Sequence, residues 1–291
     1  MFILWEKVLL NIKIEKIIKI SILKCNYISD TIWKVIKMID IEKAIKEFIK
    51  YTENYDLKAE AIERKQKHSL RVMEISKKIA TELKLSQDEI NLATLIGLLH
   101  DIARFEQYTQ YKTYRDVDSF DHGDYGVKIL NKDIRNYIDT DEYDKIIKCA
   151  VKNHNKYKIE NDLNEKEELF CKIVRDADKL DILYEILEIF WKEDKDKPNV
   201  EYSKIPDEVM EQILNREPVR RKKGDDDLVK LLCTVAFVFD INFDTSLTII
   251  EQENYINRIL NSFEFKDENT KKQIELIKED VNNYIDERLK K

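Results

Sequence analysis

The sequence predicts an all-α protein, and three features favour this fold class. The 291 residues include only four glycines and three prolines, so residues that break helices are scarce. Lysine, glutamate, isoleucine and leucine are frequent, as in helix-rich proteins. Apolar residues recur at spacings of three and four, the period of an amphipathic helix. No heptad pattern persists over several turns, so we expect a helical bundle and not a coiled coil.

The expected helices follow from this spacing and from capping signals. We expect them at about 39–50, 58–83, 86–104, 122–130, 141–153, 164–191, 226–239, 245–262 and 269–289. Ser86 with Glu89, and Asn164 with Glu167, form capping boxes that mark two of the starts. Residues 105–120 lack a clear period, which predicts a loop or short irregular helices.

One helical domain over residues 38–291 is the simplest organisation of the chain. Its motif core is expected at 39–187, with further helices at 200–291. Residues 1–37 form an N-terminal extension, either an additional helix or sequence upstream of a true start at Met38. An amphipathic helix at a membrane surface or in a partner groove is the alternative. Charged residues interrupt its apolar stretches, so no run approaches the roughly 20 residues of a transmembrane helix, and a signal-peptide pattern is missing.

Charge and cysteine usage exclude some classes of protein. The net charge of −7 argues against nucleic-acid binding, which usually needs a basic face. The four cysteines are far apart and form no CxxC pair, so neither a zinc knuckle nor a disulfide framework is indicated. We expect reduced cysteines in a cytoplasmic protein. A homo-oligomer is compatible with the sequence.

All four histidines lie between positions 68 and 154. His68 and His154 each fall on the apolar face of an expected helix, and His100 ends an apolar run and is followed at once by Asp101. His122 lies where the polar segment returns to helix. A single histidine of this kind is usually a hydrogen-bonded core residue. Burying several imidazoles with a carboxylate is costly unless something pairs with them, and a divalent metal such as Fe, Mn, Zn or Ni would do so.

A further carboxylate ligand is expected in the segment RDADKLD of the helix at 164–191. Asp178 shares a helical face with apolar residues and therefore points inward, which makes it the first candidate. Asp176 has a mixed environment on its face and is the second candidate. Asp181 is the third carboxylate of this segment.

With these residues the chain resembles the HD superfamily of metal-dependent phosphohydrolases. The resemblance covers about residues 39–187. It rests on His68, on the His100–Asp101 doublet in LLHDIARFEQ, and on Asp178 in RDADKLD. It implies a helical bundle in which these four residues bind one metal.

His122 and His154 extend the resemblance to subgroups with two metals, such as the HD-GYP cyclic-dinucleotide and the cyclic-nucleotide phosphodiesterases. By that resemblance Asp101 bridges the metals and the two histidines serve the second one. In the alternative, they hold substrate or a catalytic water. The expected cofactors are one or two divalent ions of Mn, Fe, Ni or Zn, with Mg also allowed. The chain has no GYP segment, so the resemblance does not name a substrate.

Arg104 and Lys179 are candidates for binding phosphate. Arg104 follows His100 by four residues, and its planar guanidinium suits phosphate but cannot readily donate a proton. We expect it to stabilise charge, although an arginine at a helix end is the simpler interpretation. Lys179 follows Asp178, as a phosphate-contacting lysine does in some dNTP hydrolases of the family. A solvated lysine is the alternative.

The segment 105–120 lies between two groups of candidate ligands and should border the pocket. Tyr111 could stack on a base, and Lys112 and Arg115 could hold phosphate. A packed surface loop is the alternative.

The expected function is hydrolysis of a small phosphorylated metabolite, such as a nucleotide or cyclic nucleotide. Metal-activated hydroxide would attack phosphorus, with Asp101 and Arg104 as the catalytic residues. The alternatives are an HD-fold diiron oxygenase, a catalytically silent nucleotide-binding module, and a structural protein whose histidines only pack.

Overall fold

A computed structural model describes residues 39–191 and 197–290. These residues form helices and contain no strand, which confirms the expected fold class. Residues 39–291 group into one compact unit. The predicted N-terminal extension at 1–37 and the residues 192–196 lie outside the described residues. None of the described helices is both long and apolar enough to cross a bilayer.

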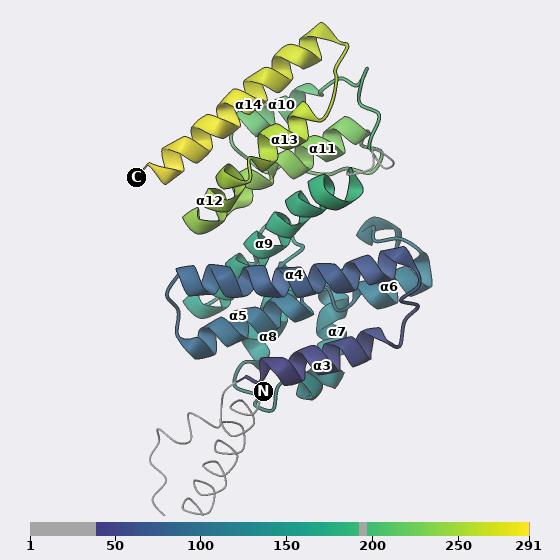
Figure 1. The fold of residues 1–291 in the computed structure, drawn as a ribbon, viewed down its shortest axis with the longest axis vertical. Coiled ribbons are helices and arrows are strands. Elements are labelled where there is room, and N and C mark those ends of the chain that lie inside the picture. Colours follow the sequence, from purple (N-terminus) through teal and green to yellow (C-terminus); the bar gives the residue numbers. More distant parts are fainter. Residues whose placement is uncertain (1–38, 192–196, 291) are drawn as a thin grey trace, which may run out of the picture. The chain divides into compact units, whose positions relative to one another are not determined.

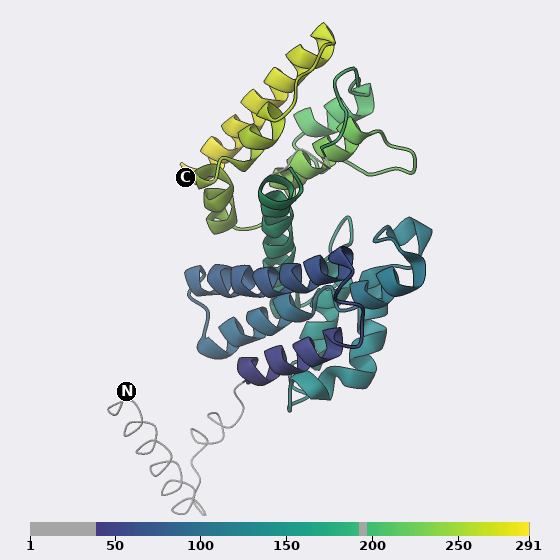
Figure 2. The same cartoon turned by 45° about the vertical axis from the view of Figure 1, so that its right-hand side comes forward.

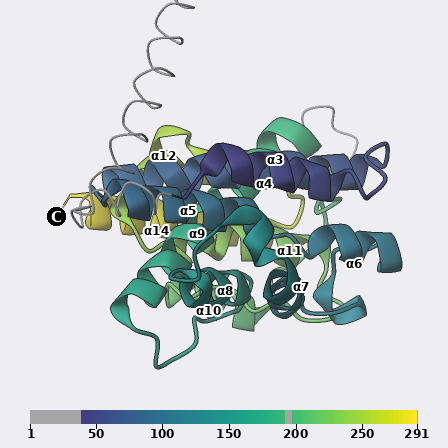
Figure 3. The ribbon, with the colours of Figure 1, turned by 90° about the horizontal axis from the view of Figure 1, so that it is seen from below.

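The first part of the described chain is built from seven α-helices (Figure 1). They are α3 (Ile41–Thr52), α4 (Glu60–Glu82), α5 (Gln87–Leu99), α6 (Arg104–Tyr111), α7 (His122–Tyr137), α8 (Asp144–Asn153) and α9 (Glu165–Glu185). A 3₁₀ turn, η1 (Asp116–Asp118), follows α6, and a π-helical turn, η2 (Ile186–Phe190), extends α9. Helix α4 packs against α5 and α9, while α8 packs against α7 and α9 (Figure 3). Both predicted capping boxes form, at the starts of α5 and α9.

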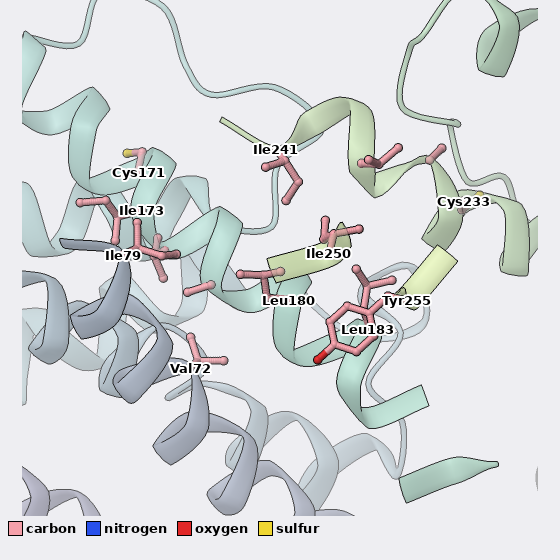
Figure 4. Packing of buried hydrophobic residues seen from close by; sticks show 14 of the residues in the cluster. Val72, Ile79, Cys171, Ile173, Leu180, Leu183, Cys233, Ile241, Ile250 and Tyr255 are labelled. Carbon is pink, nitrogen blue, oxygen red and sulfur yellow. The ribbon is translucent and has the colours of Figure 1, made fainter. Parts of the chain in front are cut away.

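The helices after residue 200 continue the same core. They are α10 (Asp207–Leu214), α11 (Asp227–Val235), η3 (Ala236–Asp240), α12 (Asp244–Gln252), α13 (Tyr255–Asn261) and α14 (Glu268–Leu289). Helix α9 runs from the first group of helices to this second group (Figures 1 and 2). Figure 4 shows why the two groups share one core: Leu180 of α9 lies beside Ile250 of α12, and Leu183 lies beside Tyr255 of α13.

Three helix boundaries differ from the sequence prediction. The helix expected at 86–104 ends at Leu99, because the chain turns over residues 100–103 before α6 begins. The helix expected at 245–262 is two helices, because Asn254 adopts a left-handed conformation with φ of 51°. Helix α7 continues to Tyr137, beyond the expected end at 130. Helix α10 was not predicted.

Gly97 allows α5 to approach α4 closely. A Cβ atom at this position would lie 2.6 Å from Ser76 Oγ and 2.9 Å from the carbonyl oxygen of Val72. The Gly97 carbonyl also lies 2.8 Å from Nδ1 of His100, at the end of the same helix. The close approach of the helices therefore determines where His100 lies relative to α4.

We predict that Gly97→Ala destabilises the fold by about 1–3 kcal/mol, because the added methyl group overpacks the α4–α5 contact. Urea unfolding followed by circular dichroism would measure the change. Lys78→Ala on the exposed face of α4 is the control and should change the free energy of unfolding by less than about 0.5 kcal/mol. A Gly97→Ala variant as stable as the control would contradict this account of the contact.

Candidate metal centre

The structure brings the four histidines together in two pairs. The Nε2 atoms of His68 on α4 and His100 at the end of α5 are 3.2 Å apart. Those of His122 at the start of α7 and His154 at the end of α8 are 3.0 Å apart. All four side chains are buried. We call these the 68–100 pair and the 122–154 pair.

Asp101 lies between the two pairs, with one carboxylate oxygen facing each. Its Oδ2 atom is 3.5 Å from Nε2 of His68 and 3.6 Å from Nε2 of His100. Its Oδ1 atom is 3.4 Å from Nε2 of both His122 and His154. The turn at residues 100–103, which ends α5, is what places this carboxylate between the pairs.

Asp178 is the carboxylate of α9 that reaches the centre. Its Oδ1 atom is 3.1 Å from Nε2 of His68 and 3.7 Å from Nε2 of His100. Asp176, the second candidate, faces away and accepts hydrogen bonds from the backbone N–H groups of Asn242 and Phe243. The structure therefore places Asp178, and not Asp176, beside His68 and His100, and its role as a metal ligand stays a prediction.

The outer nitrogen of each imidazole has its own acceptor. Nδ1 of His68 lies 2.6 Å from Asp181, and Nδ1 of His122 lies 2.6 Å from Asp116. Backbone carbonyls accept from the other two rings, namely those of Gly97 for His100 and Val151 for His154. With Nδ1 as the donor, each Nε2 can turn a lone pair inward, and this tautomer is the one that metal-ligating histidines use.

The gathered atoms fit divalent metals in number, type and spacing. At the 68–100 pair, the two Nε2 atoms lie 3.2 Å from each other and 3.1 to 3.7 Å from the oxygens of Asp101 and Asp178. At the 122–154 pair, the two Nε2 atoms and Oδ1 of Asp101 lie 3.0 to 3.4 Å apart. Ligands at about 2.1 Å from one metal would be separated by about 3.0–3.4 Å. Imidazole with carboxylate is a donor set for Mn, Fe, Ni or Zn. Without a metal, these inward-facing groups would repel one another or compete for protons.

Two cations flank the carboxylate of Asp101. Lys65 Nζ lies 2.8 Å from Oδ2, and Arg104 Nε lies 3.2 Å from Oδ1. Burial acts to raise the pKa of Asp101, but the charges of Lys65 and Arg104 oppose it, and that pKa is held well below its usual range. Asp101 is therefore ionised and ready to act as a ligand.

The guanidinium of Arg104 is held by a network of its own. Its Nη1 donates to Gln107, to the backbone carbonyl of Tyr114 and to Asp116. Asp116 also receives the Nδ1 hydrogen bond of His122. Arg104 is thus oriented by the segment after α6 and coupled to the 122–154 pair.

The other predicted substrate residues have contacts outside the ligand set. Lys179 pairs with Asp240 at 2.8 Å. The Tyr111 ring packs against Phe120, Lys112 lies over Tyr108, and Arg115 pairs with Asp118. Their roles in binding substrate remain predictions.

Lys65 and Asp116 were missed at the sequence level, and Asp181 was named as a carboxylate of its segment but not as the partner of His68. Lys65 lies three residues before His68 and Asp181 three residues after Asp178, so helical spacing could have identified both. Asp116 lies in a segment without periodicity and carries no sequence signal of its role.

We predict that Asp178→Asn removes the metal held by the 68–100 pair, because it deletes a charged ligand, whereas Asp176→Asn keeps that metal. Asp176→Asn should instead lower the free energy of unfolding by about 1–3 kcal/mol, since its partners at Asn242 and Phe243 lose a charged acceptor. Elemental analysis and urea unfolding would measure the two effects. The reverse pattern would make Asp176 the ligand.

We also predict that filling the centre at pH 8 releases about one proton per chain. Burial and Lys65 act to lower the pKa of His68, but hydrogen bonds to three carboxylates raise it to about 10. Burial and the charge of Arg104 lower the pKa of His122 to about 3, and burial lowers that of His100. At pH 8, His68 is therefore protonated and must lose its proton to a metal, whereas His100 and His122 are already neutral.

Calorimetric titration with Mn²⁺ in two buffers of different ionisation enthalpy would count these protons. Because the raised pKa makes the proton a competitor of the metal, affinity at the 68–100 pair should rise with pH up to about 10. A titration with no proton release would contradict the protonated state of His68.

Comparison with known proteins agrees with this geometry. Residues 66–183 match the family model of the HD domain. Among solved structures, the chain is similar to a Clostridium acetobutylicum protein described as a predicted HD superfamily hydrolase involved in NAD metabolism. The two are 18% identical, with 82% of this chain and 97% of that chain covered and a TM-score of 0.33. A likeness this weak carries no conclusion about activity. No curated protein matches the chain.

The matched range 66–183 contains all six residues gathered in the centre. The HD domain is a metal-dependent domain of hydrolases, and the histidine and aspartate clusters here are of the kind that could hold its metal. Residues 66–183 of this chain therefore match the HD domain, and this match supports a metal-dependent hydrolase as the general class.

Proposed function

We propose that the protein hydrolyses a phosphate ester of a small metabolite, with nucleotides and cyclic nucleotides as the first candidates. The observation that carries this proposal is the setting of Asp101. Each of its oxygens faces one histidine pair and one cation, Lys65 on the first side and Arg104 on the second. A ligand centre flanked by cations suits an anionic substrate.

The six ligands would hold two metals, with Asp101 shared between them. His68, His100 and Asp178 would complete one set, and His122 and His154 the other. When bound, divalent metals supply an activated water at neutral pH and stabilise charge on phosphate oxygens. Asp181 and Asp116 orient His68 and His122 through their Nδ1 atoms, which keeps the ligand nitrogens directed inward.

Lys65 and Arg104 would bind the non-bridging oxygens of the phosphate. Their side chains are 14% and 15% exposed, so a small ligand can reach them although both are largely enclosed. Once the oxygens of Asp101 serve metals, Lys65 needs another anionic partner and Arg104 keeps only Asp116, so a phosphate could pair with both cations. Arg104 keeps its orientation through Gln107 and Asp116 and would stabilise negative charge on the non-bridging oxygens of the phosphate.

The segment after α6 would contact the rest of the substrate. The Tyr114 ring lies 5.6 Å from Lys65 Nζ and 5.7 Å from the guanidinium carbon of Arg104, and its hydroxyl donates to the carbonyl of Ala61. This ring is therefore fixed beside both cations, where it could pack against a base or sugar. Tyr111 at the end of α6, with Lys112 and Arg115 on the segment that follows, is proposed to contribute to this outer region.

We predict that Lys65→Gln and Arg104→Gln each lower kcat/KM for a phosphate ester by about 10²–10³-fold while metal content stays unchanged, because each removes a cation aimed at the substrate. A panel of phosphate monoesters, nucleotides and cyclic nucleotides, assayed with Mn²⁺, would measure this. Lys67→Gln is the matched control: it is on the same helix, is 60% exposed and pairs with Glu63.

The Asp101→Asn variant, together with two assays of the wild type, distinguishes the proposed hydrolase from an oxygenase and from a binding module. It should abolish both metal binding and turnover, because the shared carboxylate is lost. Oxygen-dependent turnover by an iron-loaded wild type, with no phosphate release from any ester, would instead identify an oxygenase. Nucleotide binding without turnover by a metal-loaded wild type would identify a binding module.

A further inference from the structure

We infer that Arg175 is a positioning residue for His154, and that the helices after residue 200 hold Arg175 in that role through Asp240. The inference rests on the proposed two-metal centre, because His154 is a ligand of the second set. It assigns a function to a part of the chain that carries none of the metal ligands.

The guanidinium of Arg175 donates hydrogen bonds to the backbone at and after the end of α8. Its Nη1 atom donates to the carbonyl oxygens of Asn153 at 2.9 Å, His154 at 3.3 Å and Lys156 at 2.5 Å. Its Nη2 atom lies 3.5 Å from the carbonyl oxygen of Tyr157. One buried guanidinium thus contacts four of the five backbone carbonyls from 153 to 157.

Two of these carbonyls, those of Asn153 and His154, lie at the C-terminal end of α8. The last carbonyls of a helix have no intrahelical donor, and a cation there also complements the helix dipole. His154 is the capping residue of α8, and its ring is held from the same helix end through the carbonyl of Val151. Backbone and ring are therefore both fixed at this point, which directs Nε2 toward Asp101.

Asp240 is the carboxylate partner of Arg175. It receives Nη2 of Arg175 at 2.6 Å and Nζ of Lys179 at 2.8 Å. Asp176 of α9 accepts three hydrogen bonds from Asn242 and one from Phe243, and the paired cations and anions offset the cost of burying this cluster. We call residues 240–243 the latch.

Helix α14, near the C-terminal end of the chain, contacts the latch through Arg288. Arg288 donates to the carbonyl oxygen of Ile241 at 2.8 Å and to Asp244 at 2.7 Å. A continuous set of polar contacts therefore runs from α14 through the latch and Arg175 to the turn that carries His154.

The contacts of Arg175 are confined to one side of the centre. Among the described residues, its hydrogen bonds reach the 153–157 turn and Asp240 and none reaches His68, His100 or Asp178. Loss of Arg175 should therefore weaken the second metal and leave the first one bound. A residue that only stabilised the fold would not separate the two metals.

The test compares Arg175→Lys and Asp240→Asn with the wild-type full-length chain. Lysine keeps the charge but lacks the planar fork that spans several carbonyls. Asp240→Asn leaves Arg175 in place and removes its counter-charge, so it remains informative if Arg175→Lys does not fold. Arg216→Lys is the control, because Arg216 pairs with Asp280 and Glu287 within the C-terminal helices.

Calorimetric titration with Mn²⁺ is the first measurement. We expect Arg175→Lys to bind the second metal about 10–100-fold more weakly, as when a group that orients a metal ligand is lost, with the first affinity unchanged. Asp240→Asn should lie between this variant and the wild type, and Arg216→Lys should match the wild type. Equal weakening of both metals, or of neither, in folded Arg175→Lys and Asp240→Asn would overturn the inference.

The second measurement uses the metal-free protein, so it does not depend on turnover or on metal. With only four histidines, ¹⁵N-histidine labelling yields four imidazole spin systems. In both variants the signals of His154 and its neighbour His122 should shift, while those of His68 stay in place. Unchanged His154 signals would overturn the inference. If the wild type binds no Mn²⁺ but the His154 signals shift in the variants, the proposed function is contradicted and the positioning role of Arg175 is supported.

Discussion

The buried carboxylate of Asp101 is the constraint on which the arrangement of this protein depends. Four imidazoles and two carboxylates converge inside a helical bundle, where unpaired polar groups are costly. Each oxygen of Asp101 is shared between a histidine pair and a cation, so α4, α5, α7, α8 and α9 must all present a polar residue at one point. The close approach of α4 and α5 at Gly97 and the turn after α5 are both needed to bring the carboxylate there.

Sequence reasoning predicted the fold class and which residues gather, because both depend on periodicity. Apolar spacing identifies the buried faces of long helices, and His68, His154 and Asp178 lie on such faces. The turn that ends α5 could not be predicted, because the apolar run continues to His100 without a helix-breaking residue. Likewise, the bond between Asp116 and His122 depends on the path of an irregular segment, which no short-range pattern determines.

The segment after α6 and the helices after residue 200 act on opposite sides of the same histidine pair. The first orients His122 through Asp116 and also holds Arg104, whereas the second supports the turn at His154 through Arg175. The 68–100 pair is instead supported within α4 and α9, where Arg71 pairs with Asp181 and Glu185. One set of candidate ligands is thus supported within the central helices, and the other depends on parts of the chain that are distant in sequence.

Anomalous diffraction from crystals grown with Mn²⁺ would test the central claim most directly, because it locates each metal without reference to a substrate. The account predicts two peaks per chain, one on each side of the Asp101 carboxylate, the first between His68, His100 and Asp178 and the second beside His122 and His154. A single peak at the first position would remove the shared role of Asp101 and leave the 122–154 pair without a metal. No peak within reach of either oxygen of Asp101 would contradict the account.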